Sequence, residues 1–215
     1  MIIYSKKYED DWVVLSHINY ALKKGKYGKH SYALEEHKGL AVPNGEKIAL
    51  CGHGCSGQFS RYGANEFVRL LSEFGLKQNG CYELDYLSCI AAGTDDSGTS
   101  MLSATFDTFP RSVVSGACGP SLCAASTGHR VVVWPGEPGL HYYNNIEKPY
   151  LLQNGYTDDR GWIAASELWG DFLNDLTIFE RADFVGEKID SVYGELAELG
   201  KEYLFEAGRG IVTLQ

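Results

Sequence analysis

The feature that most constrains the fold is a regular alternation of apolar runs and amphipathic segments between residues 47 and 117. Three short apolar-rich segments predict strands, at residues 47–52, 82–88 and 113–117. Two segments with helical periodicity lie between these runs, at residues 64–76 and 101–109. Because strands that alternate with helices form parallel sheets, we expect an α/β fold with a mostly parallel sheet flanked by helices.

The remaining chain carries weaker signals. Residues 1–45 are expected to form a lead-in to the sheet, with one strand at 12–16. Further strands are expected at 130–134, 162–166 and 211–214, and an amphipathic helix at 187–206. Since no stretch has the composition of a linker, we expect residues 1–215 to form a single domain.

The composition limits the classes of protein to which the chain is expected to belong. The chain has 28 acidic and 19 basic residues, a net charge of −9, so nucleic acid is not an expected partner. The longest apolar runs, such as 131–134, have four residues, whereas a membrane-spanning helix needs about 20. The first residues lack the apolar core of a secretory signal. The six cysteines are too few for a disulfide scaffold, so we expect free thiols and a cytoplasmic protein.

Two chemically capable residues follow the first two predicted strands. His53 comes after the run 47–52, between Gly52 and Gly54, and Cys89 comes after the run 82–88. The carboxyl ends of neighbouring parallel strands meet at one sheet edge, so both side chains are expected there. A thiolate is a strong nucleophile, and an imidazole transfers protons near neutral pH. The pair therefore suggests nucleophilic catalysis, with Cys89 the most reactive of the six thiols.

The same two blocks carry a family resemblance. The sequences Ile-Ala-Leu-Cys-Gly-His-Gly (48–54) and Tyr-Glu-Leu-Asp-Tyr-Leu-Ser-Cys (82–89) resemble those of clan CD cysteine peptidases. This clan includes the caspases, clostripain-like and CHAT-type peptidases and the self-processing domains of bacterial toxins. The caspase signature Gln-Ala-Cys-X-Gly is replaced here by Leu-Ser-Cys-Ile, and the bacterial members look closer.

The resemblance covers about residues 45–118 and implies a caspase–haemoglobinase fold. It implies hydrolysis of peptide bonds by a Cys–His dyad, with Cys89 as nucleophile and His53 as proton-transfer residue. The backbone N–H groups of Gly54 and Cys89 would form the oxyanion hole. No cofactor or metal is expected, and the expected partner is a peptide or protein substrate. Acidic Asp95 and Asp96 either favour a basic residue in that substrate or simply form an acidic turn.

Other functions fit parts of the same sequence. Cys51, His53, Cys55 and Cys89 are candidate zinc ligands, although their spacing is unusual for zinc. Residues 52–57 match the G-x-G-x-x-G pattern of nucleotide-binding loops, but the next helix is expected to begin only near residue 64.

Two further alternatives concern the cysteine chemistry itself. A papain-like order, with Cys before His, would pair Cys89 or Cys118 with His129 or His141. A non-catalytic, caspase-like interaction module would keep the fold and lack a competent dyad.

Overall fold

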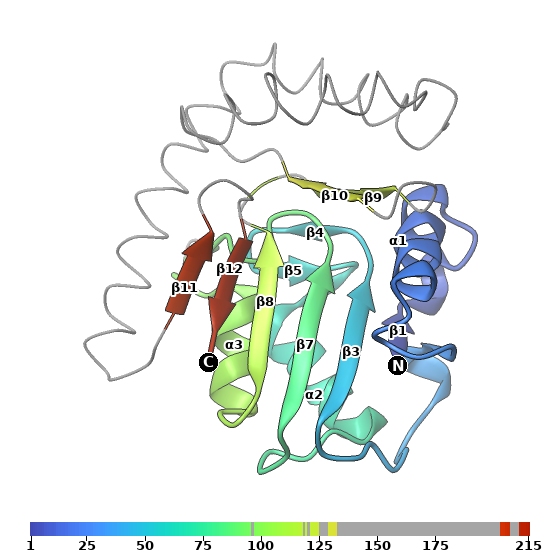
Figure 1. The fold of residues 1–215 in the computed structure, drawn as a ribbon. Coiled ribbons are helices and arrows are strands. Elements are labelled where there is room, and N and C mark those ends of the chain that lie inside the picture. Colours follow the sequence, from blue (N-terminus) through green and yellow to red (C-terminus); the bar gives the residue numbers. More distant parts are fainter. Residues whose placement is uncertain (96, 118, 120, 125–128, 133–202, 207–210) are drawn as a thin grey trace, which may run out of the picture.

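The computed structural model describes residues 1–95, 97–117, 119, 121–124, 129–132, 203–206 and 211–215. Its centre is a seven-stranded sheet with the strand order β11-β12-β8-β7-β3-β1-β2 (Figure 1). These strands are β1 (Ile2–Tyr4), β2 (Ser31–Ala33), β3 (Glu46–Cys51), β7 (Tyr82–Leu87), β8 (Val113–Ala117), β11 (Tyr203–Glu206) and β12 (Ile211–Leu214). Pairing is parallel from β2 to β8, whereas β12 and β11 pair antiparallel. The predicted mixed α/β fold with a mostly parallel sheet is confirmed.

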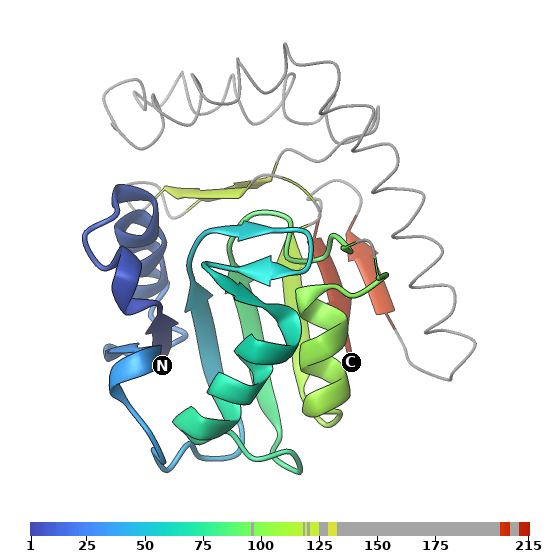
Figure 2. The same ribbon diagram turned by 180° about the vertical axis from the view of Figure 1, so that it is seen from behind.

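Two helices cover one face of this sheet, as Figure 2 shows. They are α2 (Ala64–Phe74) and α3 (Met101–Thr108), and both match predicted helices. Phe67, Leu71 and Phe74 recur on one side of α2, and all three are fully buried. They pack in one apolar cluster with Ile48 and Leu50 of β3. The helix therefore forms because its apolar stripe has a sheet face to bury.

The opposite face packs against α1 (Trp12–Lys24). A strand was predicted at 12–16, and the structure shows that this was wrong. Asp11 caps the helix by accepting hydrogen bonds from the amides of Val13 and Val14. Gly25 ends it in the left-handed conformation, with φ of 70°. These two caps, together with an apolar face on the sheet, select a helix over a strand.

The first 45 residues are also more than a lead-in. They supply β1 and β2, which extend the parallel sheet, and the short helices η1 (Lys6–Tyr8) and η2 (Leu34–Glu36). Ile2 and Ile3 of β1 are both fully buried, one on each face of the sheet. A three-residue strand is too short to give a periodic signal, which explains why it was missed.

Two small sheets lie beside the main one. Residues 53–63, between β3 and α2, contain β4 (Gly54–Cys55), β5 (Gln58–Phe59) and β6 (Tyr62–Gly63). The predicted strand 130–134 corresponds to β10 (His129–Val132), which pairs antiparallel with β9 (Ser121–Ala124). This β9–β10 pair crosses the top of the main sheet in Figure 1 and is no part of it.

The C-terminal predictions have mixed outcomes. The predicted strand 211–214 is confirmed as β12. The predicted helix 187–206 is wrong over its last four residues, which form β11. Its remainder, and the predicted strand 162–166, lie outside the described residues. Among the helices that the structure describes, none has the length and apolar character required to cross a membrane.

Candidate functional site

The strand register brings His53 and Cys89 to the same place. β3 and β7 pair in parallel, with Cys51 opposite Leu87. His53 and Cys89 lie two residues beyond this pair, at the carboxyl edge of neighbouring strands. Both residues lie just beyond the strand ends, and His53 contacts Asp11, the residue that caps α1. The expected juxtaposition of the two residues at one sheet edge is therefore present in the fold.

The His53 ring is fixed by two contacts on the α1 side. Its Nε2 lies 3.1 Å from Oδ1 of Asp11, the residue that caps α1. The ring of Tyr8 packs edge-on against it, with 5.2 Å between the ring centroids. The imidazole remains 40% exposed, so one side of the ring is accessible to a reactant.

The Cys89 thiol contacts the β9–β10 pair instead of His53. Its Sγ accepts a hydrogen bond from the Ser121 amide at 3.3 Å, and it donates to the Ser121 carbonyl at 3.5 Å. Burial raises the pKa of Cys89, an effect that the Ser121 backbone and the charge of Arg130 only partly offset. Among the described contacts, no hydrogen bond joins Cys89 to His53. In this arrangement the thiol is therefore protonated, partly exposed and hydrogen-bonded to the Ser121 backbone.

The Gly54 backbone packs directly on the Cys89 segment. A Cβ at Gly54 would lie far inside contact distance of the Cys89 carbonyl oxygen and 3.0 Å from Oγ of Ser88. The amide of Ser60 bonds to the His53 carbonyl, so Gly54 and Phe59 form the non-bonded type of antiparallel pair. The Gly54 N–H consequently points away from β5. Only glycine permits this close approach.

A buried ion pair holds the β9–β10 pair on the sheet. Arg130 of β10, whose side chain is 6% exposed, lies 3.0 Å from Oδ1 of Asp85 in β7. The same guanidinium donates to the Tyr86 carbonyl and to Oγ of Ser121. Burial raises the pKa of Asp85, but the charge of Arg130, the Tyr27 hydrogen bond and the charge of Lys26 together outweigh it, so the net pKa lies below its ordinary value. Arg130 therefore links the sheet directly to the residue that bonds to the Cys89 thiol.

This environment changes the expected order of thiol reactivity. Cys55 and Cys81 are exposed, Cys89 is partly exposed, and Cys51 and Cys123 are buried. Cys89 was predicted to be the most reactive thiol, but its partial burial and raised pKa argue against that order.

The described residues give little support to the metal and nucleotide alternatives. No three His, Cys, Asp or Glu side chains among them gather as ligands of a metal ion. The glycine-rich segment 52–57 contains the strand β4 and ends just before β5, and α2 begins only at Ala64. It lacks the immediate helix N-terminus that binds phosphate in nucleotide folds.

The papain-like alternative falls largely on residues outside the description. Cys118 and His141 are among the residues that the structure does not describe, and so is Asp96. His129 begins β10, paired with Ala124 of β9.

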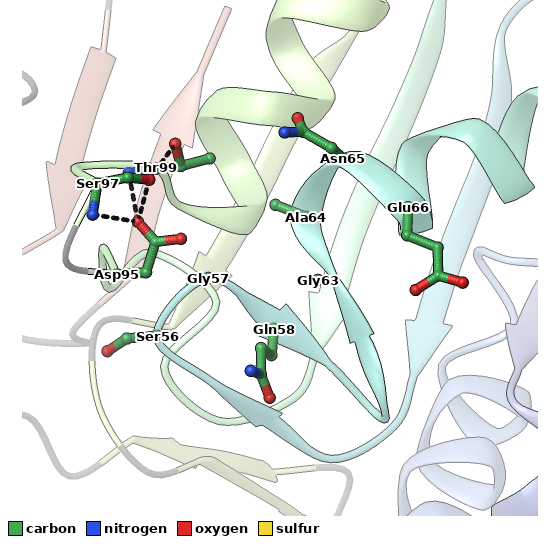
Figure 3. A pocket seen from close by; sticks show the side chains of 10 residues that line it. All are labelled: Ser56, Gly57, Gln58, Gly63, Ala64, Asn65, Glu66, Asp95, Ser97 and Thr99. Atoms are coloured by element: carbon green, nitrogen blue, oxygen red, sulfur yellow. Dashed lines mark hydrogen bonds between the residues drawn. The ribbon is translucent and has the colours of Figure 1, made fainter.

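A polar cavity of about 270 Å³ lies near the start of α2 (Figure 3). Asp95, Ser56 and Asn65 are among its lining residues, and neither His53 nor Cys89 is. Oδ1 of Asp95 accepts hydrogen bonds from the amides of Ser97 and Thr99. These bonds fit the acidic-turn interpretation of Asp95, because they occupy the carboxylate locally.

Sequence reasoning missed the residues that contact the predicted pair. Asp11 and Tyr8 come from the expected lead-in, and Ser121 lies between the predicted strands 113–117 and 130–134. The order of the parallel strands reverses between β1 and β3, and ligands of open α/β sheets bind at such a switch point. Asp11 and Tyr8 follow β1 and His53 follows β3, so the three residues lie at that point. An N-capping aspartate before a helical pattern was the available signal for Asp11.

Comparison of the chain with models of known protein families gives no match, and comparison with curated proteins gives none either.

Proposed function

We propose that this protein is a cysteine endopeptidase with a caspase–haemoglobinase-like fold, in which Cys89 and His53 form the catalytic dyad. The observation that carries the proposal is the register of β3 and β7, because both strands end at the same sheet edge two residues before His53 and Cys89. The resemblance of residues 48–54 and 82–89 to clan CD peptidases agrees with that placement. The five described cysteines are free, in keeping with a reducing, cytoplasmic environment.

The proposed chemistry has two steps. The Cys89 sulfur, after losing its proton to His53, attacks the carbonyl carbon of the scissile peptide bond. Collapse of the tetrahedral intermediate breaks the C–N bond, and His53 returns the proton to the leaving amine. A water molecule then attacks the thioester, giving the carboxylic acid and the free thiol. Neither step needs a cofactor.

The negative oxygen of each intermediate needs hydrogen-bond donors. The N–H groups of Gly54 and Cys89 have no backbone acceptor among the described residues, and they belong to adjoining segments. Two preorganised N–H groups in such a position stabilise an oxyanion, and losing one donor raises the barrier by about 3–4 kcal/mol in serine peptidases.

The Ser121 contact gives the proposal a further requirement. Because Ser121 bonds to Sγ through both its N–H and its C=O, a substrate that approaches the sulfur from the side of β9 must displace Ser121. The structure is therefore assigned to the resting form of the proposed enzyme.

The test is cleavage of a fluorogenic peptide library by the wild-type protein and by Cys89→Ala. Turnover should fall to background in Cys89→Ala, while its melting temperature stays close to that of the wild type. Cys55→Ala is the matched control, because Cys55 is an exposed thiol close to His53 in the chain and should be dispensable. Mass spectrometry of acid-quenched reactions should detect an acyl group on Cys89. Wild-type turnover that persists in Cys89→Ala would disprove the assignment.

A further inference from the structure

Asp11 lies where it affects both the helix α1 and the His53 ring. Its Oδ1 accepts hydrogen bonds from the amides of Val13 at 2.9 Å and Val14 at 3.2 Å. The same oxygen lies 3.1 Å from Nε2 of His53. Two backbone donors at the start of a helix fix the position of the carboxylate, so His53 meets a rigid partner.

The ionisation state of Asp11 determines its effect on the His53 ring. Burial raises the pKa of Asp11, but the hydrogen bonds from His53 and the two helix amides outweigh it, and the net pKa is lowered. The group is therefore an ionised acceptor at neutral pH. A neutral imidazole beside an acceptor at Nε2 carries its proton on Nε2, and this leaves Nδ1 with a free lone pair.

We propose that Asp11 is a positioning residue for His53: it holds the ring in the Nε2–H form and so makes Nδ1 the nitrogen that exchanges protons with Cys89 and the leaving amine. This inference rests on the proposed peptidase function. When Nδ1 takes the Cys89 proton, the ring becomes an imidazolium, and the adjacent carboxylate stabilises that charge. Tyr8 contributes by restricting rotation of the ring.

The alternative is that Asp11 only caps α1, and one substitution separates the two roles. Asp11→Ser keeps a good capping oxygen but is too short to hold Nε2 of His53. Asp10→Ser is the matched control, because Asp10 is an exposed acid one residue away. Both variants lose one negative charge, and serine keeps an oxygen that can cap α1, so the main difference between them is the contact with His53.

The first measurement does not depend on activity. Nitrogen NMR of the imidazole rings, at about pH 8 where free histidine is neutral, distinguishes the two tautomers. The His53→Ala variant identifies the signal of His53 among the six histidines. We expect the Nε2–H form in the wild type and in Asp10→Ser, and a mixture of both forms in Asp11→Ser. An unchanged tautomer in Asp11→Ser would overturn the positioning role.

The second measurement uses a peptide that the wild-type protein cleaves in the library experiment. Asp11→Ser should lower kcat by roughly 10- to 100-fold, as loss of an orienting partner commonly does, and leave KM and the melting temperature nearly unchanged. In the His53→Ala background the same substitution should have no further effect, because Asp11 acts through His53. Additive losses would overturn the inference. A wild-type protein that cleaves no peptide, yet shows the expected tautomers, would disprove the peptidase function and leave the Asp11–His53 coupling established.

Discussion

Replacing the buried His17 should remove an acid sensitivity from the protein. His17 lies in α1, is fully buried, and has no hydrogen-bond partner on either ring nitrogen within the described structure. The Ser121 backbone lies beside the ring but outside hydrogen-bonding geometry. Burial, followed by the charge of Arg130, lowers the pKa of His17 to about 3. The folded protein therefore holds this histidine in its neutral form.

The size of the effect follows from proton linkage. An unfolded histidine has a pKa near 6.5, so below that pH the unfolded chain binds a proton that the native state does not. Stability consequently falls as the pH drops from about 6.5 towards 3, and it is regained as the pH rises. Between pH 7 and pH 5 this single group should cost about 2 kcal/mol of unfolding free energy. In His17→Leu that contribution is absent, and the two unpaired nitrogens are replaced by an apolar side chain of similar bulk.

The assay is urea denaturation of the wild type and His17→Leu at about pH 7 and about pH 5, with the exposed His30→Gln as control. The stability of His17→Leu relative to the wild type should rise by about 2 kcal/mol on going to the lower pH. His30→Gln should follow the wild type. If His17→Leu loses as much stability in acid as the wild type, the buried ring is not the group that titrates, and the argument fails.

Two further substitutions test the surroundings of Cys89. Arg130→Met should cost about 1–3 kcal/mol in urea denaturation, because Asp85 then keeps only weaker partners, among them Tyr27 and the exposed Lys26. A loss well under about 1 kcal/mol would mean that the ion pair contributes little to holding β10. Gly54→Ala should lower the stability by about 1–3 kcal/mol, and it should also lower kcat, because its Cβ meets the Cys89 carbonyl oxygen. A Cβ at Gly63 meets no atom within 4 Å, so Gly63→Ala should change neither quantity. Equal effects at the two glycines would contradict the close packing at Gly54.

The central strands and helices were predictable because the burial of their apolar side chains produces a local periodicity in the sequence. The helix α2 places Phe67, Leu71 and Phe74 on one side, and any sheet face of sufficient size would select that helix. The strand β3 is apolar over its last four residues, as expected of a strand covered on both faces. The strand β7 instead alternates apolar residues with Glu83 and Asp85, which is the period-2 pattern of a strand. In these segments local preference and tertiary packing agree.

The missed elements are those in which packing, and not periodicity, decides the structure. Residues 12–16 suit a strand or a helix equally, and the caps Asp11 and Gly25 with the adjacent sheet select the helix. The strand β1 has three residues and is recognisable only by its two neighbours, β2 and β3. The strand β11 pairs with β12, so its conformation depends on a partner strand beyond its own sequence.

The candidate site shows the same difference between what local sequence determines and what tertiary packing determines. The positions of His53 and Cys89 were predictable, because parallel strands joined by a crossover helix end at the same edge. Their partners were not, since Asp11 is 42 residues before His53 and Ser121 is 32 residues after Cys89. Contacts over such separations depend on which segments the folded sheet places together, and that information is absent from local patterns.

The contact between Cys89 and Ser121 has a consequence for how a substrate would bind. Ser121 presents a backbone N–H and a backbone C=O to the sulfur, the same pair of groups that every peptide bond carries. Under the proposed function, a substrate strand can therefore replace β9 beside Cys89 without leaving backbone groups unpaired. The Arg130–Asp85 pair opposes this exchange, because it holds β10 and thus its partner β9 on the sheet. The balance between these two interactions decides whether β9 or a substrate lies beside the thiol.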